Sequence, residues 1–126
     1  MFILRKIEGG RFNVFEPQIL TVGNTAVTSG QALVLNEGKL VLCAQDAKPT
    51  FIALADAVGT SGKPADVHVG RVESNQLYDV AVVSGVTVGG KYKLTTTADG
   101  ITSTAATTAG AEVVAIGSDF VTVRFA

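Results

Sequence analysis

The chain has 126 residues, of which 17% are charged and 47% hydrophobic, and its formal net charge is −1. This length suits one domain, and the near-neutral charge argues against the basic face with which proteins bind nucleic acid. No apolar run reaches the ~20 residues that a membrane-spanning helix needs, and a single Cys permits no internal disulfide. We therefore expect one domain that binds neither nucleic acid nor a membrane and that is made in a cytoplasm.

The first 20 residues differ from the rest because they combine large apolar side chains with the chain's basic cluster. We expect residues 1–20 to form an N-terminal arm or β-ribbon that turns at Gly9-Gly10, ahead of a single β domain over residues 21–126. A lone ribbon is marginally stable and sticky, so it needs a partner, either the body of its own domain or another chain. The side chains available for such a contact are Phe2, Leu4, Arg5, Lys6, Arg11, Phe12 and Phe15.

Alternation of apolar and polar residues dominates the rest of the chain. Val121 and Val123, for example, alternate with Thr122 and Arg124, a period typical of a half-buried strand. Gly-rich turns separate such runs about every ten residues, the rhythm of a β-sandwich or barrel. The sequence predicts an all-β fold, a small β-barrel or β-sandwich with almost no helix. The expected strands lie near 2–7, 31–36, 39–44, 51–56, 66–72, 77–83, 91–96, 111–116 and 119–125.

Residues 30–55 and 89–116 resemble each other. Each stretch contains a short apolar run, a turn with Gly, a second run and, after a polar connector, an apolar strand. This pattern indicates either an internal repeat or a coincidence that any all-β chain can produce. The sequence leaves both interpretations open.

Residues suited to catalysis are sparse. The single His, His68, shares a strand face with Asp66, as an exposed strand residue would. Cys43 lies in an apolar run, which is typical of a buried thiol rather than a nucleophile. One His and one Cys cannot complete a zinc site, and the 11 carboxylates are spread without a calcium-loop pattern. We expect no enzymatic activity, no metal and no cofactor.

A resemblance to a known family rests on three segments. The run from Val27 to Leu40, with its Ser29-Gly30 start, resembles a hairpin of tailed-phage capsid cement (decoration) proteins and their head-fibre relatives. The segment 51–55, Phe-Ile-Ala-Leu-Ala, and the closing pattern from Gly110 to Phe125 are also similar to theirs. The resemblance covers most of the chain from about Val27 onward and does not include the N-terminal segment.

The resemblance implies a structural virion protein. Such a protein folds as a β-barrel or sandwich, trimerises, and binds the major capsid protein on the outside of the expanded capsid. A low charge fraction with many aliphatic side chains also favours a homotrimer. The N-terminal ribbon would then add strands to an open sheet edge of the capsid or of a sister subunit. The alternative is that it completes the sheet of its own subunit.

Two other classes of function remain open. A carbohydrate-binding or adhesive module, such as a head-fibre base, also needs only a β-sandwich. Its sites usually present Trp or Tyr side chains, and this chain has no Trp and only Tyr78 and Tyr92. A small hydrolase is disfavoured by the sparse catalytic residues.

Overall fold

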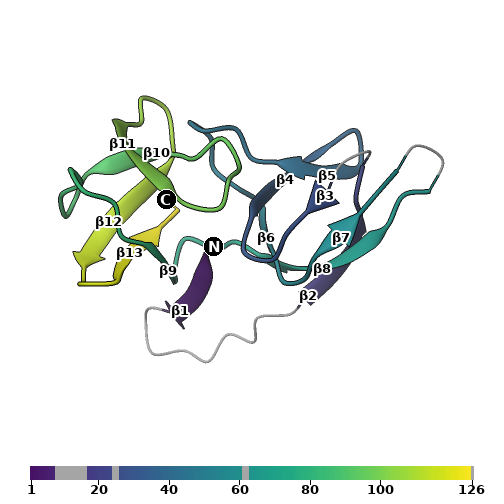
Figure 1. Cartoon of the computed structure of the whole chain (residues 1–126), viewed down its shortest axis with the longest axis horizontal. Helices are drawn as coiled ribbons and strands as arrows, with labels where there is room; N and C mark the ends of the chain where they lie inside the picture. Colours follow the sequence, from purple (N-terminus) through teal and green to yellow (C-terminus); the bar gives the residue numbers. More distant parts are fainter. Residues whose placement is uncertain (8–16, 24–25, 61–62, 126) are drawn as a thin grey trace.

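The computed structural model describes residues 1–7, 17–23, 26–60 and 63–125, and these form 13 strands and no helix (Figure 1). The expected all-β class is confirmed. Two large antiparallel sheets pack together without closing into a barrel, as in a β-sandwich. A small third sheet joins β3 (Ala26–Val27) to β7 (Ala57–Val58).

The first large sheet has six strands in the order β1-β9-β13-β12-β10-β11. It occupies one half of the molecule, on the left in Figure 1. Its two edge strands are therefore β1, from the N-terminus, and β11. The strands are β1 (Ile3–Ile7), β9 (Gln76–Ala81), β13 (Phe120–Arg124), β12 (Ala111–Ile116), β10 (Lys91–Leu94) and β11 (Ile101–Ala105).

The second large sheet has five strands in the order β2-β8-β6-β4-β5. A single parallel bridge between Val22, just after β2, and Leu40 on β5 links its two edges at one end. The strands are β2 (Pro17–Thr21), β8 (Asp66–Arg71), β6 (Phe51–Ala53), β4 (Ala32–Asn36) and β5 (Lys39–Leu42).

Alternating side chains supply two buried clusters. The larger cluster consists mainly of side chains from the second half, among them Tyr78 on β9, Val123 on β13 and Phe125 just after β13, and it also contains Ala32 and Ile52 from the five-stranded sheet. The smaller cluster is built by the five-stranded sheet and its flanking segments. It contains Val22, Val27, Leu33, Leu40, Phe51, Ala53, Val67 and Val69. Burial of these aliphatic side chains, each favourable by roughly 1.5–3 kcal/mol, is the main force that holds the strands in register.

The two large sheets repeat one connectivity. The first half contributes β2, β4, β5, β6 and β8, and the second half contributes β9 to β13. When the five strands of each half are counted in chain order, both sheets have the spatial order 1-5-4-2-3, which is β2-β8-β6-β4-β5 in one and β9-β13-β12-β10-β11 in the other. The strand β1 is added outside β9, and the small β3–β7 sheet occurs only in the first half. The similarity of residues 30–55 and 89–116 therefore corresponds to equivalent positions in two like halves.

Matching backbone hydrogen bonds support this equivalence residue by residue. The Gly30 N–H donates to Ala53 O at 2.8 Å, and the Gly89 N–H donates to Val113 O at 2.8 Å. Both glycines have a positive φ, 86° and 88°, which explains why Gly occupies both positions. Further equivalent pairs are Gln31 N to Thr28 O with Gly90 N to Thr87 O, Ala53 N to Gln31 O with Val113 N to Gly90 O, and Cys43 N to Ala32 O with Ala106 N to Lys91 O.

The N-terminal segment belongs to both sheets of its own domain. Strand β1 pairs antiparallel with β9, whereas β2 pairs with β8 in the other sheet. The strands on either side of Gly9-Gly10 thus pair with different parts of the domain and not with each other. Residues 8–16 lie outside the described residues.

The connectors of the two halves contact each other through Asp46. The Asp46 carboxylate accepts hydrogen bonds from the backbone N–H groups of Thr107, Thr108 and Ala109, at 3.0 to 3.2 Å, and from the Thr107 hydroxyl. These bonds favour the ionised carboxylate and hold the pKa of Asp46 well below its usual range. The segment between β5 and β6 is thereby tied to the segment between β11 and β12.

Replacing Asp46 by Asn should lower the melting temperature at neutral pH. Because the folded-state pKa of Asp46 is depressed, its stabilisation is fully present above the unfolded-state pKa of about 4 and is lost as the pH falls toward the folded value. The gap in melting temperature between wild type and Asp46→Asn should therefore narrow below about pH 4. Thr107→Val should reduce the effect of Asp46→Asn in a double-mutant cycle. A gap that stays constant with pH would contradict this role of the carboxylate.

Candidate binding surface

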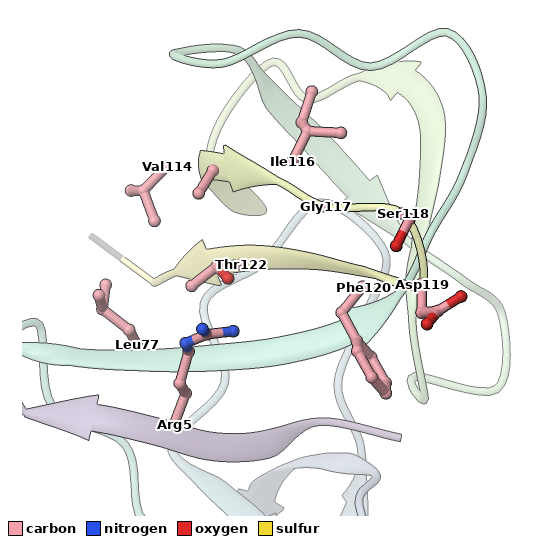
Figure 2. Close-up of a pocket in the computed structure, with 10 residues that line it drawn as sticks. Arg5, Leu77, Val114, Ile116, Gly117, Ser118, Asp119, Phe120 and Thr122 are labelled. Atoms are coloured by element: carbon pink, nitrogen blue, oxygen red, sulfur yellow. The ribbon is translucent and has the colours of Figure 1, made fainter.

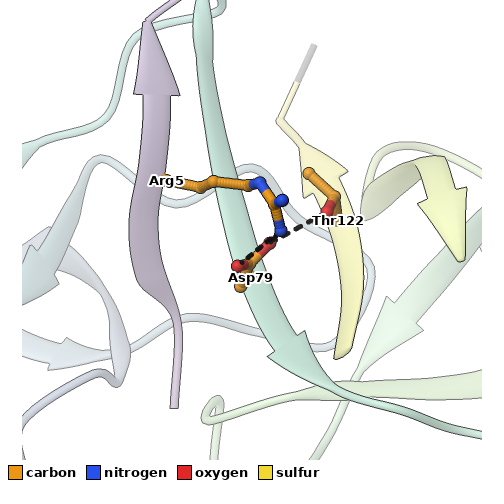
Figure 3. Close-up of polar contacts among 3 residues, drawn as sticks. All are labelled: Arg5, Asp79 and Thr122. Carbon is orange, nitrogen blue, oxygen red and sulfur yellow. Dashed lines mark hydrogen bonds and ion pairs between the residues drawn. The ribbon is translucent and has the colours of Figure 1, made fainter. Parts of the chain in front are cut away.

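The outer face of the six-stranded sheet carries a polar centre built around Arg5. The register of β1 against β9 shifts between Leu4 and Lys6, which leaves Arg5 in a β-bulge. Bulges bend the strand and re-aim a side chain. Here the Arg5 side chain lies across the face of the sheet, toward β9 and β13 (Figure 3).

Arg5, Asp79 and Thr122 form one polar chain across three strands. Nη1 of Arg5 donates to the two carboxylate oxygens of Asp79 at 3.0 and 3.2 Å, and the Thr122 hydroxyl donates to Oδ1 of Asp79 at 2.8 Å. The Arg5 side chain is 57% exposed, whereas that of Asp79 is 17% exposed. An ion pair this exposed adds at most about 1 kcal/mol to stability. It leaves a largely solvated guanidinium on the surface.

Apolar side chains surround this polar centre. They and Arg5 line an open depression of about 580 Å³ over the ends of β9, β12 and β13 (Figure 2). Phe120 and Ile116 are 48% and 46% exposed at its rim, and Leu77 is half-buried. We call Arg5, Leu77, Ile116, Phe120 and Thr122 the outer patch. Exposed aromatic and aliphatic groups around a paired Arg are the composition expected of a protein-binding surface.

The residues predicted for a contact are placed differently from one another. Phe2 is 2% exposed and packs edge-to-face on Phe125, with ring centroids 5.2 Å apart, so it belongs to the core of its own chain. Leu4 is half-buried against the same core. Only the backbone of Lys6 is described, in β1, and Arg11, Phe12 and Phe15 lie outside the described residues. Among the seven, Arg5 is the one described side chain that is mostly exposed.

A second depression of about 300 Å³ lies beside β1. Leu4 and Ile3 line it from β1, and Ile52 and Leu54 line it from β6 and the residue that follows. The Phe2 N–H donates to Gly30 O at 2.9 Å, which connects the start of β1 to the segment just before β4 of the five-stranded sheet. This depression therefore lies where the two halves of the domain meet.

Cys43 and His68, the residues considered as candidates for catalysis, lie where a structural residue would lie. Cys43 is buried, its thiol donates to Ala44 O and Ala47 O at 3.4 and 3.7 Å, and burial raises its pKa to about 11. A thiol with that pKa is a poor nucleophile at neutral pH. His68 is exposed on β8 on the same face as Asp66, as its strand parity predicts. Within the described residues, no three His, Cys, Asp or Glu side chains lie close enough together to hold a metal ion.

Sequence reasoning missed most of the outer patch. Phe120 shares the parity of Thr122 and Arg124, opposite to that of Val121 and Val123, so alternation alone places this aromatic residue on the outer face. The exposed position of Phe120 could therefore have been predicted from the sequence. The ion pair between Arg5 and Asp79 could not, because it depends on the pairing of β1 with β9 and on the bulge.

The described part of the chain contains no helix that is long and apolar enough to cross a membrane. Searches against protein-family models, curated proteins and solved structures find no match to this chain.

Proposed function

We propose that the protein is a structural virion protein, a capsid cement or decoration protein that binds the outside of a phage capsid, as a homotrimer, and stabilises it. The observation that carries the proposal is the outer patch, where Phe120 and Ile116 remain exposed around a paired Arg5. The sequence resemblance to cement proteins points to the major capsid protein as the partner.

The outer patch fits docking on a protein surface better than binding of a small molecule. Its depression is open, its rim is apolar, and its buried polar groups are already hydrogen-bonded to one another. Arg and aromatic side chains are enriched among the residues that dominate protein interfaces. A partner that covers Phe120 and Ile116 would remove apolar area from water and exclude solvent from the Arg5–Asp79 pair.

Trimerisation would allow three weak contacts to bind the capsid with high avidity. Each copy would present one outer patch to a different capsid subunit, so the second and third contacts become intramolecular once the first has formed. Linked contacts of this kind slow dissociation by orders of magnitude without a tighter individual interface. That is what a protein needs if it holds neighbouring capsomers together against the pressure of packaged DNA.

Two features weigh against the other functions. Tyr78 and Tyr92 are 0% and 8% exposed, so neither offers the aromatic platform of a carbohydrate-binding site. Burial raises the pKa of Tyr78, and its hydroxyl donates to Gln76 Oε1 at 2.6 Å within the core. The raised pKa and buried position of Cys43 weigh against a thiol-dependent hydrolase.

Binding to capsids tests the proposal directly. Purified protein is mixed with expanded capsids assembled from the major capsid protein of the same phage, and the bound fraction is measured by co-sedimentation. Phe120→Ser should weaken binding at least roughly tenfold, the loss typical of an exposed aromatic anchor. Val58→Ser is the matched control, since Val58 is 67% exposed on the small β3–β7 sheet, away from the outer patch.

The possible outcomes test the proposed function and the proposed contact surface separately. Wild-type protein that fails to bind capsids at all would overturn the function. Capsid binding that is equally strong in wild type and Phe120→Ser would keep the function and move the contact elsewhere. Sedimentation of the free protein and counting of copies on the particle test the trimer, which is wrong if isolated single copies decorate the capsid.

A further inference from the structure

One cross-strand row of the first half is buried against the second half. Ala32 on β4 pairs with Ile52 on β6, and Ile52 pairs with Gly70 on β8. Ala32 is 0% and Ile52 2% exposed, and both belong to the larger cluster, which consists mainly of side chains from the second half. This face of the five-stranded sheet is therefore covered within the chain.

The equivalent row of the second half is charged and faces solvent. The matching backbone hydrogen bonds of the two halves place Lys91 on β10 at the position of Ala32. Lys91 pairs with Glu112 on β12, and Glu112 pairs with Arg124 on β13. The Lys91 residue is exposed, and Glu112 and Arg124 are half-buried. The same face of the repeated unit thus packs inside the molecule in one half and lies on its surface in the other.

At the other end of this face the two halves differ in the opposite sense. Asp66 begins β8, and Phe120 begins the equivalent strand β13. Asp66 is exposed and accepts a hydrogen bond from the Thr21 hydroxyl at 3.3 Å, whereas the exposed residue Phe120 is aromatic. The repeat therefore does not account for the apolar surface at Phe120. The outer face of the second half has an apolar end at Phe120 and a charged end at β10.

The charged end carries more cations than carboxylates. Nη2 of Arg124 donates to Oε1 of Glu112 at 3.3 Å. Lys93 lies on the same face of β10 as Lys91, because Tyr92 between them is buried. Neither lysine has an ion-pair partner among the described residues. Three cations therefore accompany one carboxylate here, although the net charge of the whole chain is −1.

We propose that the outer face of the second half, from the outer patch to Lys91 and Lys93, binds an acidic protein surface. Carboxylates of the partner would lie opposite the two lysines, and its apolar side chains would cover Phe120 and Ile116. Phe120 and Arg124 are four positions apart on β13 (124 − 120), or about 13 Å. An interface of the usual size, about 800 Å² per partner, spans both ends of the face. The inference rests on the proposed function, in which the partner is the major capsid protein, and adds the chemistry of its contact surface.

An acidic protein fits this face better than a nucleic acid does. The Asp119 carboxylate lies beside Phe120 at the depression (Figure 2), and Asp79 and Glu112 lie on the same face. The regularly spaced phosphates of a nucleic acid would approach these carboxylates as well as the lysines. A protein surface can place its carboxylates at the lysine end alone. Charges matched in this way accelerate association and fix the orientation of the partner.

The salt dependence of capsid binding tests the inference. Lys91→Gln combined with Lys93→Gln should weaken binding to expanded capsids about three- to tenfold at low salt, because two exposed ion pairs are lost. The loss should fall below about twofold at roughly 0.5 M salt, where exposed charges are screened. Lys39→Gln combined with Lys63→Gln is the matched control, since it changes the net charge equally at exposed positions of the first half. This control should bind capsids as wild type does at both salt concentrations.

Two further measurements accompany the comparison. The melting temperatures of both double variants should stay close to that of wild type, because the lysines of β10 have no ion pair to lose among the described residues. The binding defect of Phe120→Ser should persist at high salt, because burial of apolar surface does not depend on charge. The two ends of the face are thus distinguished by their response to salt.

Each result bears on the inference or on the function beneath it. Wild type that fails to bind capsids overturns both. Wild type that binds, with the two lysine double variants equally affected at low salt, keeps the proposed function and overturns the acidic contact. Wild type that binds random-sequence duplex DNA as tightly as capsids at roughly 0.15 M salt would make this a nucleic-acid-binding face, and the acidic protein surface would be wrong.

Discussion

Replacing Phe2 by Ala is expected to lower the free energy of unfolding by about 3–5 kcal/mol, the usual cost of deleting a buried Phe side chain. The ring is 2% exposed and packs edge-to-face on Phe125, which itself lies 5.6 Å from the ring of Tyr78. Loss of the ring would leave a cavity in the larger buried cluster, at the start of β1. Urea denaturation with matched m-values measures the change.

The neighbouring residue supplies the control. Ile3, the first residue of β1, is 48% exposed, so Ile3→Ala should cost less than about 1 kcal/mol. Removal of residues 2–15 should be at least as damaging as Phe2→Ala, because it takes β1 off its sheet as well. A truncated chain that melts at the wild-type temperature would mean that the N-terminal segment is an arm for another chain and not part of this domain.

Gly110→Ala should be comparably destabilising, by about 2–4 kcal/mol, because a strained backbone conformation and an overpacked contact each cost about 1–3 kcal/mol. Gly110 precedes β12 with a φ of 95°, a conformation that residues with a Cβ rarely adopt. A Cβ at this position would lie 2.4 Å from Tyr92 O and 2.8 Å from Cβ of Ala106. Because one of these atoms belongs to the backbone of β10, relief requires the strand to move.

Gly38→Ala separates strain from crowding. Gly38 has a φ of 77° in the turn between β4 and β5, and a Cβ there would meet nothing within 4 Å. This variant should therefore cost only about 1–2 kcal/mol, the penalty of the left-handed conformation alone. Equal losses for the two variants, measured by urea denaturation, would show that crowding against Tyr92 contributes nothing.

Strand positions could be predicted from the sequence where alternation is regular. The expected strands near 39–44, 66–72, 91–96 and 111–116 each overlap one of the observed strands β5, β8, β10 and β12. In β8 and β10 buried apolar residues alternate with charged or polar outward ones, so the period of these strands is unambiguous. The four strands without a counterpart in that prediction are β2, β3, β7 and β11.

The missed strands lack this signal for physical reasons. β3 and β7 have two residues each, too few for a period to show. β11 reads Ile-Thr-Ser-Thr-Ala, and three of its residues are exposed, as expected of an edge strand with little to bury. β2 begins at a Pro, which cannot donate a hydrogen bond to a neighbouring strand and so weakens the sequence signal for a strand.

The candidate surface was harder to predict than the fold. Large apolar residues of the N-terminal segment indicated a contact, but a sequence does not say whether that contact lies within the chain or between chains. For Phe2 the structure gives an internal contact, with Phe125, which lies 123 positions later in the chain (125 − 2). Arg5 meets Asp79 because β1 pairs with β9, with a register shift at Arg5 itself. Long-range pairing of this kind is invisible to local patterns.

The unequal distribution of the two buried clusters makes the halves unequal as folding units. The smaller cluster draws all its fully buried residues from the first half, whereas the second half shares its interior with the first. One half thus has a buried cluster of its own, whereas the cluster of the other half also takes in Phe2 and side chains of the first half. Loss of the contacts between the halves should therefore expose buried apolar surface in the second half while leaving the smaller cluster of the first half intact.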